Sequence, residues 1–229
     1  MTRTISRILM TLVAAMAIGL SARSQVADYK YDLGLELGMS GYLGDANGSN
    51  IFKHPGLAAS VTGRYIANVR WDIRVNLGML KLSGNTDDYA MVLPGDAHYK
   101  FSSSVYELGG RFEFNFFPYG IGEPYKHLRR WTPYAALGIG FSVASCDGTT
   151  SFAPNIPMAV GVKYKLRERW NLGVEFSMTK VFGDKIDGNL TDLYGIKSSF
   201  AKNTDWYSRL AVSVSYEFGK RCVTCHYVD

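Results

Sequence analysis

A two-residue period runs through most of the chain and limits what it can fold into. In eight segments every second residue is apolar, aromatic or glycine, and none of these positions is charged. The segments cover residues 31–39, 57–65, 71–79, 106–116, 135–143, 158–166, 170–178 and 210–218. Because successive side chains of a β-strand point to opposite faces, each segment predicts a strand with one apolar face. The pattern favours an all-β fold and argues against a helical one.

The residues between the apolar positions separate a soluble sandwich from a membrane barrel, since both architectures have strands with one apolar face. These positions are mostly small or charged, and many are glycine: Gly34, Gly38, Gly78, Gly109, Gly138, Gly140, Gly161 and Gly173. Glycine weakens a solvated strand face, whereas inside a narrow closed barrel it makes room for larger neighbours. We therefore expect an eight-stranded antiparallel transmembrane barrel of the outer-membrane type, with roughly ten residues per crossing. Charged residues make up 20% of the chain, too many for a bundle of membrane helices.

The connections and the bulky aromatics give the barrel an expected orientation. Only about three residues follow the second and sixth segments, whereas about a dozen follow the first, fourth and fifth. About twenty follow the third, and over twenty follow the seventh. Bulky aromatics gather at the end with the short connections: Tyr31, Tyr65, Trp71, Phe116, Tyr134, Tyr164, Trp170, Tyr216 and Phe218. Such a girdle is typical of a membrane interface. We expect this end, with both chain termini, to lie in the periplasm and the opposite loops to lie outside the cell.

The amino-terminal residues 1–24 are predicted to be a cleaved secretory signal. Arg3 and Arg7 precede an apolar run at residues 8–20, which is shorter than the about 20 residues a membrane-spanning helix needs. The barrel is then expected at residues 25–219 and a periplasmic tail at residues 220–229. Loss of the signal lowers the net charge from +5 to +2, because three arginines leave with it, and this argues against a nucleic-acid partner.

The predicted inward faces carry a mixed set of charges. An eight-stranded barrel has an interior that side chains can fill, so a wide pore is not expected. Seven acids and five bases are predicted to point inward: Asp32, Glu36, Arg64, Asp72, Arg74, Glu107, Arg111, Glu113, Lys163, Lys165, Glu175 and Glu217. Buried charges are costly unless they are paired, so we expect a structural ion-pair network rather than a proton path or a catalytic carboxylate pair.

The candidate catalytic and calcium-binding groups are incomplete. His98 lies near the serines at 102–104, as a lipid enzyme would require, but no acidic residue at a fixed spacing orients the histidine. Oxygen ligands in the last long connection lack the spacing of a recognised calcium loop: Asp184, Asp187, Asn189 and Asp192. We therefore expect no enzymatic activity from these groups.

The tail carries the string CVTCH, which matches the attachment pattern of c-type haem. No segment follows it that could wrap a haem, and zinc on Cys222, Cys225 and His226 would need a fourth ligand, so we expect no cofactor. In the oxidising periplasm, Cys222 and Cys225 either bond to each other or tether a partner. Cys146 is expected in an outer loop across the membrane from them.

The connection between the fourth and fifth segments is unusual for a simple barrel. Residues 118–130 contain proline and glycine bends, and Lys126, Arg129 and Arg130 make the segment basic. Small barrels usually keep the connections on the periplasmic side short. These bases either bind a partner or lie among anionic lipid headgroups.

Four strings resemble the PorG family, small outer-membrane barrels associated with the type IX secretion system: YLGDAN at 42–47, LKLSGNTDD at 80–88, YELGGRFEFNFFPYG at 106–120 and RRWTPYAALGIG at 129–140. The resemblance covers most of residues 31–145 and weakens from the sixth segment onward. It implies a non-enzymatic part of the machine that exports cargo bearing a C-terminal signal. It also implies contact with the periplasmic ring built from the lipoprotein PorK and its partner PorN. The alternative is a free-standing small barrel that acts as a surface adhesin through its outer loops or as an outer-membrane lipid enzyme through His98.

Overall fold

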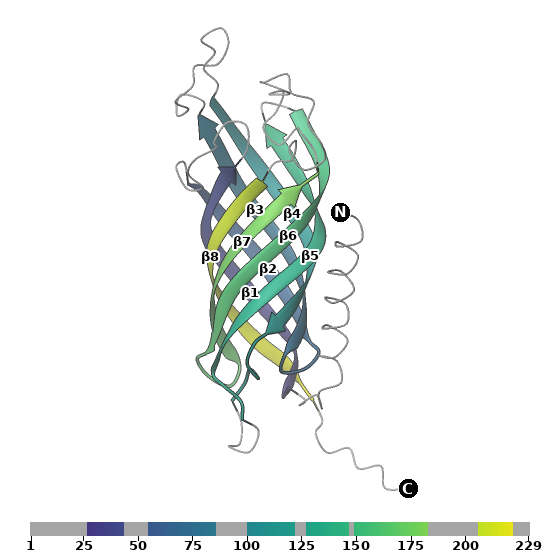
Figure 1. Cartoon of the computed structure of the whole chain (residues 1–229), viewed down its shortest axis with the longest axis vertical. Coiled ribbons are helices and arrows are strands. Elements are labelled where there is room, and N and C mark those ends of the chain that lie inside the picture. Colours follow the sequence, from purple (N-terminus) through teal and green to yellow (C-terminus); the bar gives the residue numbers. More distant parts are fainter. Residues whose placement is uncertain are drawn as a thin grey trace, which may run out of the picture.

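The computed structural model describes residues 27–43, 55–85, 100–121, 127–146, 149–182 and 206–221. These residues form strands β1 (Tyr29–Leu43), β2 (Gly56–Ile66), β3 (Trp71–Asn85), β4 (Lys100–Asn115), β5 (Trp131–Cys146), β6 (Thr149–Lys165), β7 (Trp170–Val181) and β8 (Trp206–Lys220). Each strand pairs antiparallel with the next, and β8 pairs with β1, so the sheet closes into an eight-stranded barrel (Figure 1). The predicted fold class is confirmed. Within the described ranges, no helix has the length and apolar character needed to cross a bilayer.

The two-residue alternation sets the two faces of the barrel wall. Outward apolar side chains such as Leu37 and Ile139 are 69% and 75% exposed. Inward neighbours such as Glu36 and Arg74 are buried. Every apolar position in the eight segments predicted from the sequence is exposed or half-buried. A continuous apolar exterior of this size suits lipid and would be an aggregation hazard in water.

The two ends of the barrel differ, and we name them for their connections. The turn end carries residues 67–70, 116–121, 127–130 and 166–169 together with residues 27–30 and 219–221, and the loop end lies opposite. The strands are longer than expected, with 15 residues in β3 and 17 in β6. The extra residues extend the strands at the loop end, where Lys81 and Ser145 replace apolar residues on the outward face. The predicted ten residues per crossing therefore describe the apolar band rather than the whole strand.

The connection between the fifth and sixth strands corrects the sequence analysis. A loop of about a dozen residues was expected, but β5 continues to Cys146 and β6 begins at Thr149. Phe152 prolongs the apolar face and stacks on Phe141, with ring centroids 5.3 Å apart. Pro154 lies at the end of the β6–β7 ladder, where its carbonyl oxygen accepts a bond from the Phe182 amide at 2.9 Å, and proline is tolerated at such a position. Cys146 is thus the last residue of β5 and not part of a long loop.

Candidate functional site: the sealed lumen and the turn end

The centre of the lumen is organised by Arg74, which is fully buried on β3. Its guanidinium contacts three carboxylates from three other strands. Nε lies 2.9 Å from Oε1 of Glu113, Nη2 lies 2.5 Å from Oε2 of Glu175, and Nη1 lies 3.3 Å from Oε1 of Glu36. Charge-assisted contacts of this kind are strong only when the buried charges are well matched. Arg74 therefore joins opposite walls of the barrel.

The remaining predicted lumen charges extend this network toward the turn end and the middle of the barrel. Arg64 lies 2.7 Å from Asp32 and 3.2 Å from Glu113. Lys163 bridges Asp72 at 2.8 Å and Glu113 at 2.9 Å. Two further pairs complete the set, Lys165 with Glu217 at 2.6 Å and Arg111 with Glu107 at 2.9 Å. The structure thus places all of the predicted inward charges inside the barrel, each in at least one ion pair.

Sequence reasoning missed three lumen residues at the ends of the alternating segments. Arg209 is buried and lies 3.3 Å from Glu36 and 3.4 Å from Glu175, so the described lumen holds seven acids and six bases. Tyr134 was expected in the aromatic girdle, but it is 2% exposed and donates a 2.6 Å hydrogen bond to Glu175. Tyr207 donates a hydrogen bond of 2.6 Å to Glu107. Extending the inward parity by one position before the apolar runs would have found Tyr134 and Arg209, and a second position would have found Tyr207.

The lumen is closed at the loop end by apolar side chains. Leu80, Leu82, Val105 and Val181 are each at most 1% exposed and belong to one cluster. In this part of the barrel the inward face is apolar, and the outward face mixes polar residues such as Lys81 with apolar ones such as Phe152. Because packed side chains fill this level, it leaves no water-filled path among the described residues.

At the turn end, the described parts of the β4–β5 connection (residues 116–121 and 127–130) fold across the mouth. The Tyr119 amide donates to the carbonyl oxygen of Val69 at 3.1 Å, and its hydroxyl donates to Oδ1 of Asn171 at 2.8 Å. The ammonium groups of Lys163 and Lys165 lie 5.7 and 5.1 Å from the Tyr119 ring centroid. Burial, and next the charge of Glu217, raise the pKa of Tyr119 above its ordinary value, so its hydroxyl keeps the proton that it donates.

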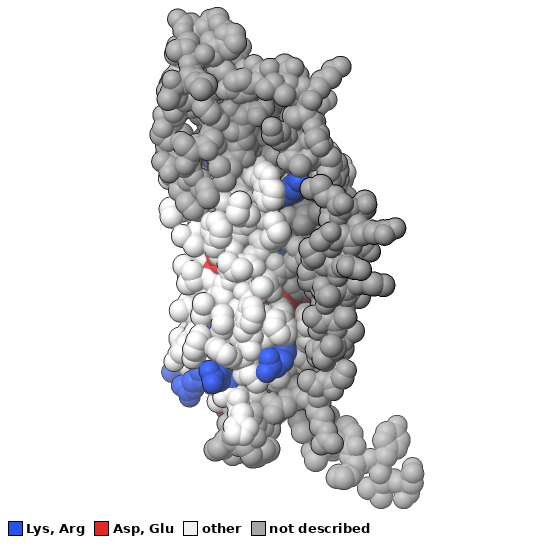
Figure 2. Space-filling model, viewed as in Figure 1, with Lys and Arg blue, Asp and Glu red and all other residues white. Residues whose placement is uncertain are grey.

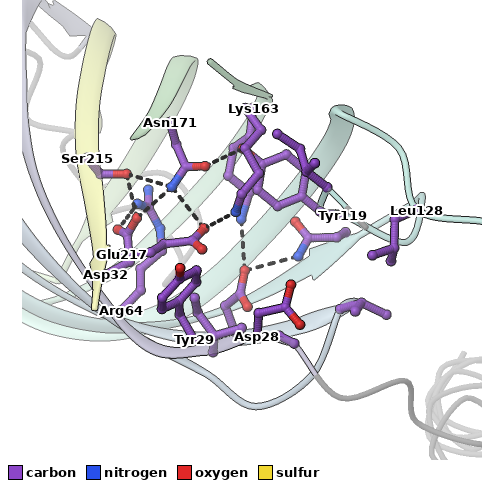
Figure 3. A pocket seen from close by; sticks show the side chains of 18 of the residues that line it. Asp28, Tyr29, Asp32, Arg64, Tyr119, Leu128, Lys163, Asn171, Ser215 and Glu217 are labelled. Atoms are coloured by element: carbon purple, nitrogen blue, oxygen red, sulfur yellow. Dashed lines mark hydrogen bonds and ion pairs between the residues drawn. The ribbon is translucent and has the colours of Figure 1, made fainter. Parts of the chain in front are cut away.

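Figure 3 shows Tyr119, Lys163, Asn171 and Glu217 around the cavity that remains at the turn end. The cavity has a volume of about 40 Å³, which is enough for a few water molecules and too small for a transported solute. Its lining is mixed: charged residues such as Asp32 and Arg64 lie beside apolar ones such as Ile66. The described part of the lumen is therefore filled in the middle and narrowed at both ends.

The surface of the turn end is strongly basic. Its described residues include eight bases, Lys30, Arg70, Arg129, Arg130, Arg167, Arg169, Lys220 and Arg221, against two acids, Asp28 and Glu168. Figure 2 shows Lys and Arg side chains gathered below a mostly white band, in which only small areas of Asp and Glu are visible on this face. This arrangement gives the turn end a positive field that attracts an anionic surface.

Two of the predicted partner-binding bases lie on this surface. Arg129 and Arg130 are exposed, and the Arg129 guanidinium carbon lies 4.4 Å from the centroid of the Phe117 ring. The backbone of this connection is held by bonds from Gly120 N to Arg129 O at 3.0 Å and from Arg129 N to Pro118 O at 2.8 Å. Lys126, Cys222, Cys225 and His226 lie outside the described residues, as do the proposed signal peptide and nearly all of the tail.

Most of the residues that the sequence suggested for catalysis or metal binding lie outside the described ranges. His98 and the possible calcium ligands at 184–192 lie outside the described residues. Ser103 is buried, and its hydroxyl donates to the carbonyl oxygen of Ser145 at 3.4 Å. Within the described ranges, no three residues of the His, Cys, Asp and Glu types are grouped so that they could hold a metal ion.

Comparisons with known proteins place the chain by family and by fold. Residues 6–227 match a family model described as "Domain of unknown function (DUF6089)". No curated protein matches the chain. The crystal structure of Neisserial surface protein A is similar, with 13% identity and a TM-score of 0.51 over 82% of this chain and 97% of that one. This likeness shows the fold alone, that of a small outer-membrane barrel.

Two other solved structures have lower TM-scores. Ail of Yersinia pestis, in complex with the heparin analogue sucrose octasulfate, has 9% identity and a TM-score of 0.48 over 83% of this chain and 99% of that one. The outer membrane protein OprG from Pseudomonas aeruginosa has 11% identity and a TM-score of 0.47 over 85% of this chain and 100% of that one. The resemblance to the PorG family stays a prediction beside these findings.

Proposed function

The chain belongs to the DUF6089 family, and we propose that it is a non-enzymatic outer-membrane component of the type IX secretion machinery. In this proposal the turn end faces the periplasm and docks a ring of PorK-like and PorN-like proteins to the outer membrane. The observation that carries the proposal is the β4–β5 connection, which is folded across the mouth of a filled barrel and presents Arg129 and Arg130 outward.

The filled lumen supports a structural role over transport. Arg74 and its partners occupy the middle, Leu80 and Leu82 fill the loop end, and Tyr119 covers the turn end. A barrel that passes solutes needs a continuous polar opening, which eight strands rarely provide. The surfaces outside the lumen are therefore the better candidates for function.

The β4–β5 connection supports docking because it is long and held in place. A barrel that only spans the membrane needs no more than a tight turn at this position, as residues 67–70 and 166–169 illustrate. Arg129 is fixed by two backbone bonds and by its contact with Phe117, so less conformational entropy is lost when it binds. Exposed bases on a fixed segment suit an acidic protein surface.

The strings that resemble the PorG family coincide with this connection. FNFFPYG covers residues 114–120 and includes Phe117 and Tyr119, the residues that hold Arg129 and close the mouth. RRWTPYAALGIG begins with Arg129 and Arg130. Two of the four strings thus border the connection where the structure departs most from a simple barrel, which supports the proposed partner.

The test is affinity purification of the tagged protein from outer membranes, with quantification of the co-purified periplasmic lipoprotein. We expect the wild type to retain the ring proteins. With the variant Arg129→Glu/Arg130→Glu the amount of co-purified lipoprotein should fall about fivefold or more, because reversed charges repel an acidic surface. Lys81→Glu, a charge reversal on the loop end, serves as the control and should retain the ring. A wild-type barrel that purifies alone would contradict the proposal. Truncation after Arg221 tests the tail separately, under non-reducing conditions with free thiols blocked.

A further inference from the structure

A second arginine on the turn end is held in place without an acidic partner. Arg169 lies in the turn between β6 and β7, and its Nε donates to the hydroxyl of Tyr29 at 3.2 Å while Nη1 donates to the hydroxyl of Tyr216 at 2.9 Å. The guanidinium carbon lies 5.3 Å from the centroid of the Tyr29 ring. Tyr29 of β1 and Tyr216 of β8 thus orient the side chain of Arg169, which belongs to the β6–β7 turn. The two bonds leave Nη2 without a hydrogen-bond partner among the described residues.

Other bases surround this arginine. Lys220 is opposite Tyr29 in the β1–β8 register, Lys30 follows Tyr29, and Arg167 lies on the same turn as Arg169. All four side chains are exposed. We call Lys30, Arg167, Arg169 and Lys220 the β1–β8 basic cluster. The cluster side chains come from β1, β8 and the β6–β7 turn, whereas Arg129 and Arg130 belong to the β4–β5 connection. The two turns are neighbours, because the backbone amide of Lys165 donates to the carbonyl oxygen of Arg130 at 2.7 Å.

The aromatic side chains beside the cluster fix its depth. Tyr31 stacks on Phe218 with ring centroids 5.6 Å apart, and Trp170 meets Tyr216 edge-on at 5.2 Å. These rings lie on the outward face at the turn-end border of the apolar band. Tyrosine and tryptophan in such a band sit at the level of the lipid headgroups. The basic cluster is therefore placed at headgroup depth rather than beyond the membrane.

We propose that the β1–β8 basic cluster binds the phosphate of an anionic phospholipid, such as phosphatidylglycerol, in the leaflet at the turn end. A guanidinium matches phosphate oxygens with two parallel hydrogen bonds, and Tyr29 and Tyr216 orient the Arg169 fork before the lipid arrives. Lys30 and Lys220 add point charges that favour a lipid with net negative charge over a zwitterionic one. An acidic protein is a poorer fit, because the cluster adjoins rings that lie among the lipids.

Native mass spectrometry of the purified full chain tests this inference. The protein is equilibrated in micelles with equal amounts of phosphatidylglycerol and phosphatidylcholine, and the lipids that remain bound are counted. We expect the wild type to retain phosphatidylglycerol selectively. In Arg169→Gln the ratio of bound phosphatidylglycerol to bound phosphatidylcholine should fall about fivefold, because each base near an anionic headgroup contributes to binding. Lys81→Gln removes one exposed base from the loop end and should keep the wild-type ratio.

Two conservative variants separate an oriented site from general attraction. Tyr216→Phe keeps every charge but removes one bond that orients Arg169, and Arg169→Lys keeps the charge but not the planar fork, so both should lose part of the selectivity. Equal retention of the two lipids by the wild type would overturn the inference, as would equal losses in Arg169→Gln and Lys81→Gln. Unchanged selectivity in both conservative variants would overturn the oriented site. Displacement of the lipid by millimolar inorganic phosphate would overturn the assignment to a lipid. None of these outcomes bears on retention of the ring by Arg129 and Arg130.

Discussion

Replacing Arg74 by methionine tests whether the lumen network holds the barrel together. Arg74 is fully buried and contacts Glu36, Glu113 and Glu175. Methionine fills a similar space without a charge, so the substitution removes three ion-pair contacts and creates little cavity. The charge of the described lumen becomes one unit more negative, and the excess of seven acids over six bases increases.

The expected loss in the free energy of unfolding depends on which ion-pair partners each carboxylate still has in the variant. Breaking a buried ion pair by removing one partner costs about 3–5 kcal/mol, because a buried charge is left unpaired. Here Glu113 keeps Arg64 and Lys163, and Glu175 keeps Arg111. Because no carboxylate becomes wholly unpaired, we expect a loss near the lower limit, about 3 kcal/mol in the free energy of unfolding. That is a large part of the roughly 5–15 kcal/mol typical of a folded domain.

The assay is urea unfolding of the barrel in lipid vesicles, followed by tryptophan fluorescence and by the heat-modifiable mobility of the folded form on gels. Arg209→Met is the matched comparison, since Arg209 contacts two carboxylates at the longer distances of 3.3 and 3.4 Å, and should lose only about 1–2 kcal/mol. Adding Glu113→Gln to Arg74→Met removes one of the repelling acids, so the double variant should lose less than the sum of the single variants. A loss below about 1 kcal/mol for Arg74→Met, or a larger loss for Arg209→Met than for Arg74→Met, would contradict a central stabilising role for Arg74.

Three further predictions concern the lumen and its ends. A methyl group on Gly138 would lie 2.0 Å from the carbonyl oxygen of Gly110, so Gly138→Ala should lose about 1–3 kcal/mol in the urea assay, whereas Gly110→Ala faces open space on the lipid side and should stay within about 0.5 kcal/mol of wild type. Planar bilayer recordings should show no steady conductance above background, and a stable open channel would contradict the filled lumen. The raised pKa of Tyr119 means that the folded state holds this proton above pH of about 10, where the unfolded chain releases it. Stability should therefore fall as pH rises above about 10, and the fall should be smaller in Tyr119→Phe; parallel pH profiles of the two proteins would argue against it.

The wall of the barrel could be predicted from the sequence because lipid and lumen impose opposite requirements on alternate residues. The same rule places Glu36 inward and Leu37 outward, and the structure has both as expected. The rule was stopped too early at the ends of the segments, so Tyr134 and Arg209 were misplaced or overlooked. It also failed for residues 149–157, where Pro154 and Pro157 interrupt the pattern although the strand continues.

The partners inside the lumen could not be predicted from spacing along the chain. Arg74 and Glu175 are 101 residues apart and meet because their strands face each other across the barrel. Tyr119 is similar, since nothing in its segment indicates that its hydroxyl reaches Asn171. Such contacts depend on the stagger of the closed sheet, which eight separate strand patterns do not specify. The basic character of the β4–β5 connection, in contrast, was readable from its composition.

Export of cargo decides whether the barrel belongs to the secretion machinery. The gene is deleted in its host, and a protein bearing the C-terminal export signal is quantified in the medium and in the periplasm. We expect the cargo to accumulate inside the cell and export to return with the wild type and with Lys81→Glu, but not with Arg129→Glu/Arg130→Glu. Normal export from the deletion strain would contradict a role in secretion, and would favour a free-standing barrel that acts through its loops.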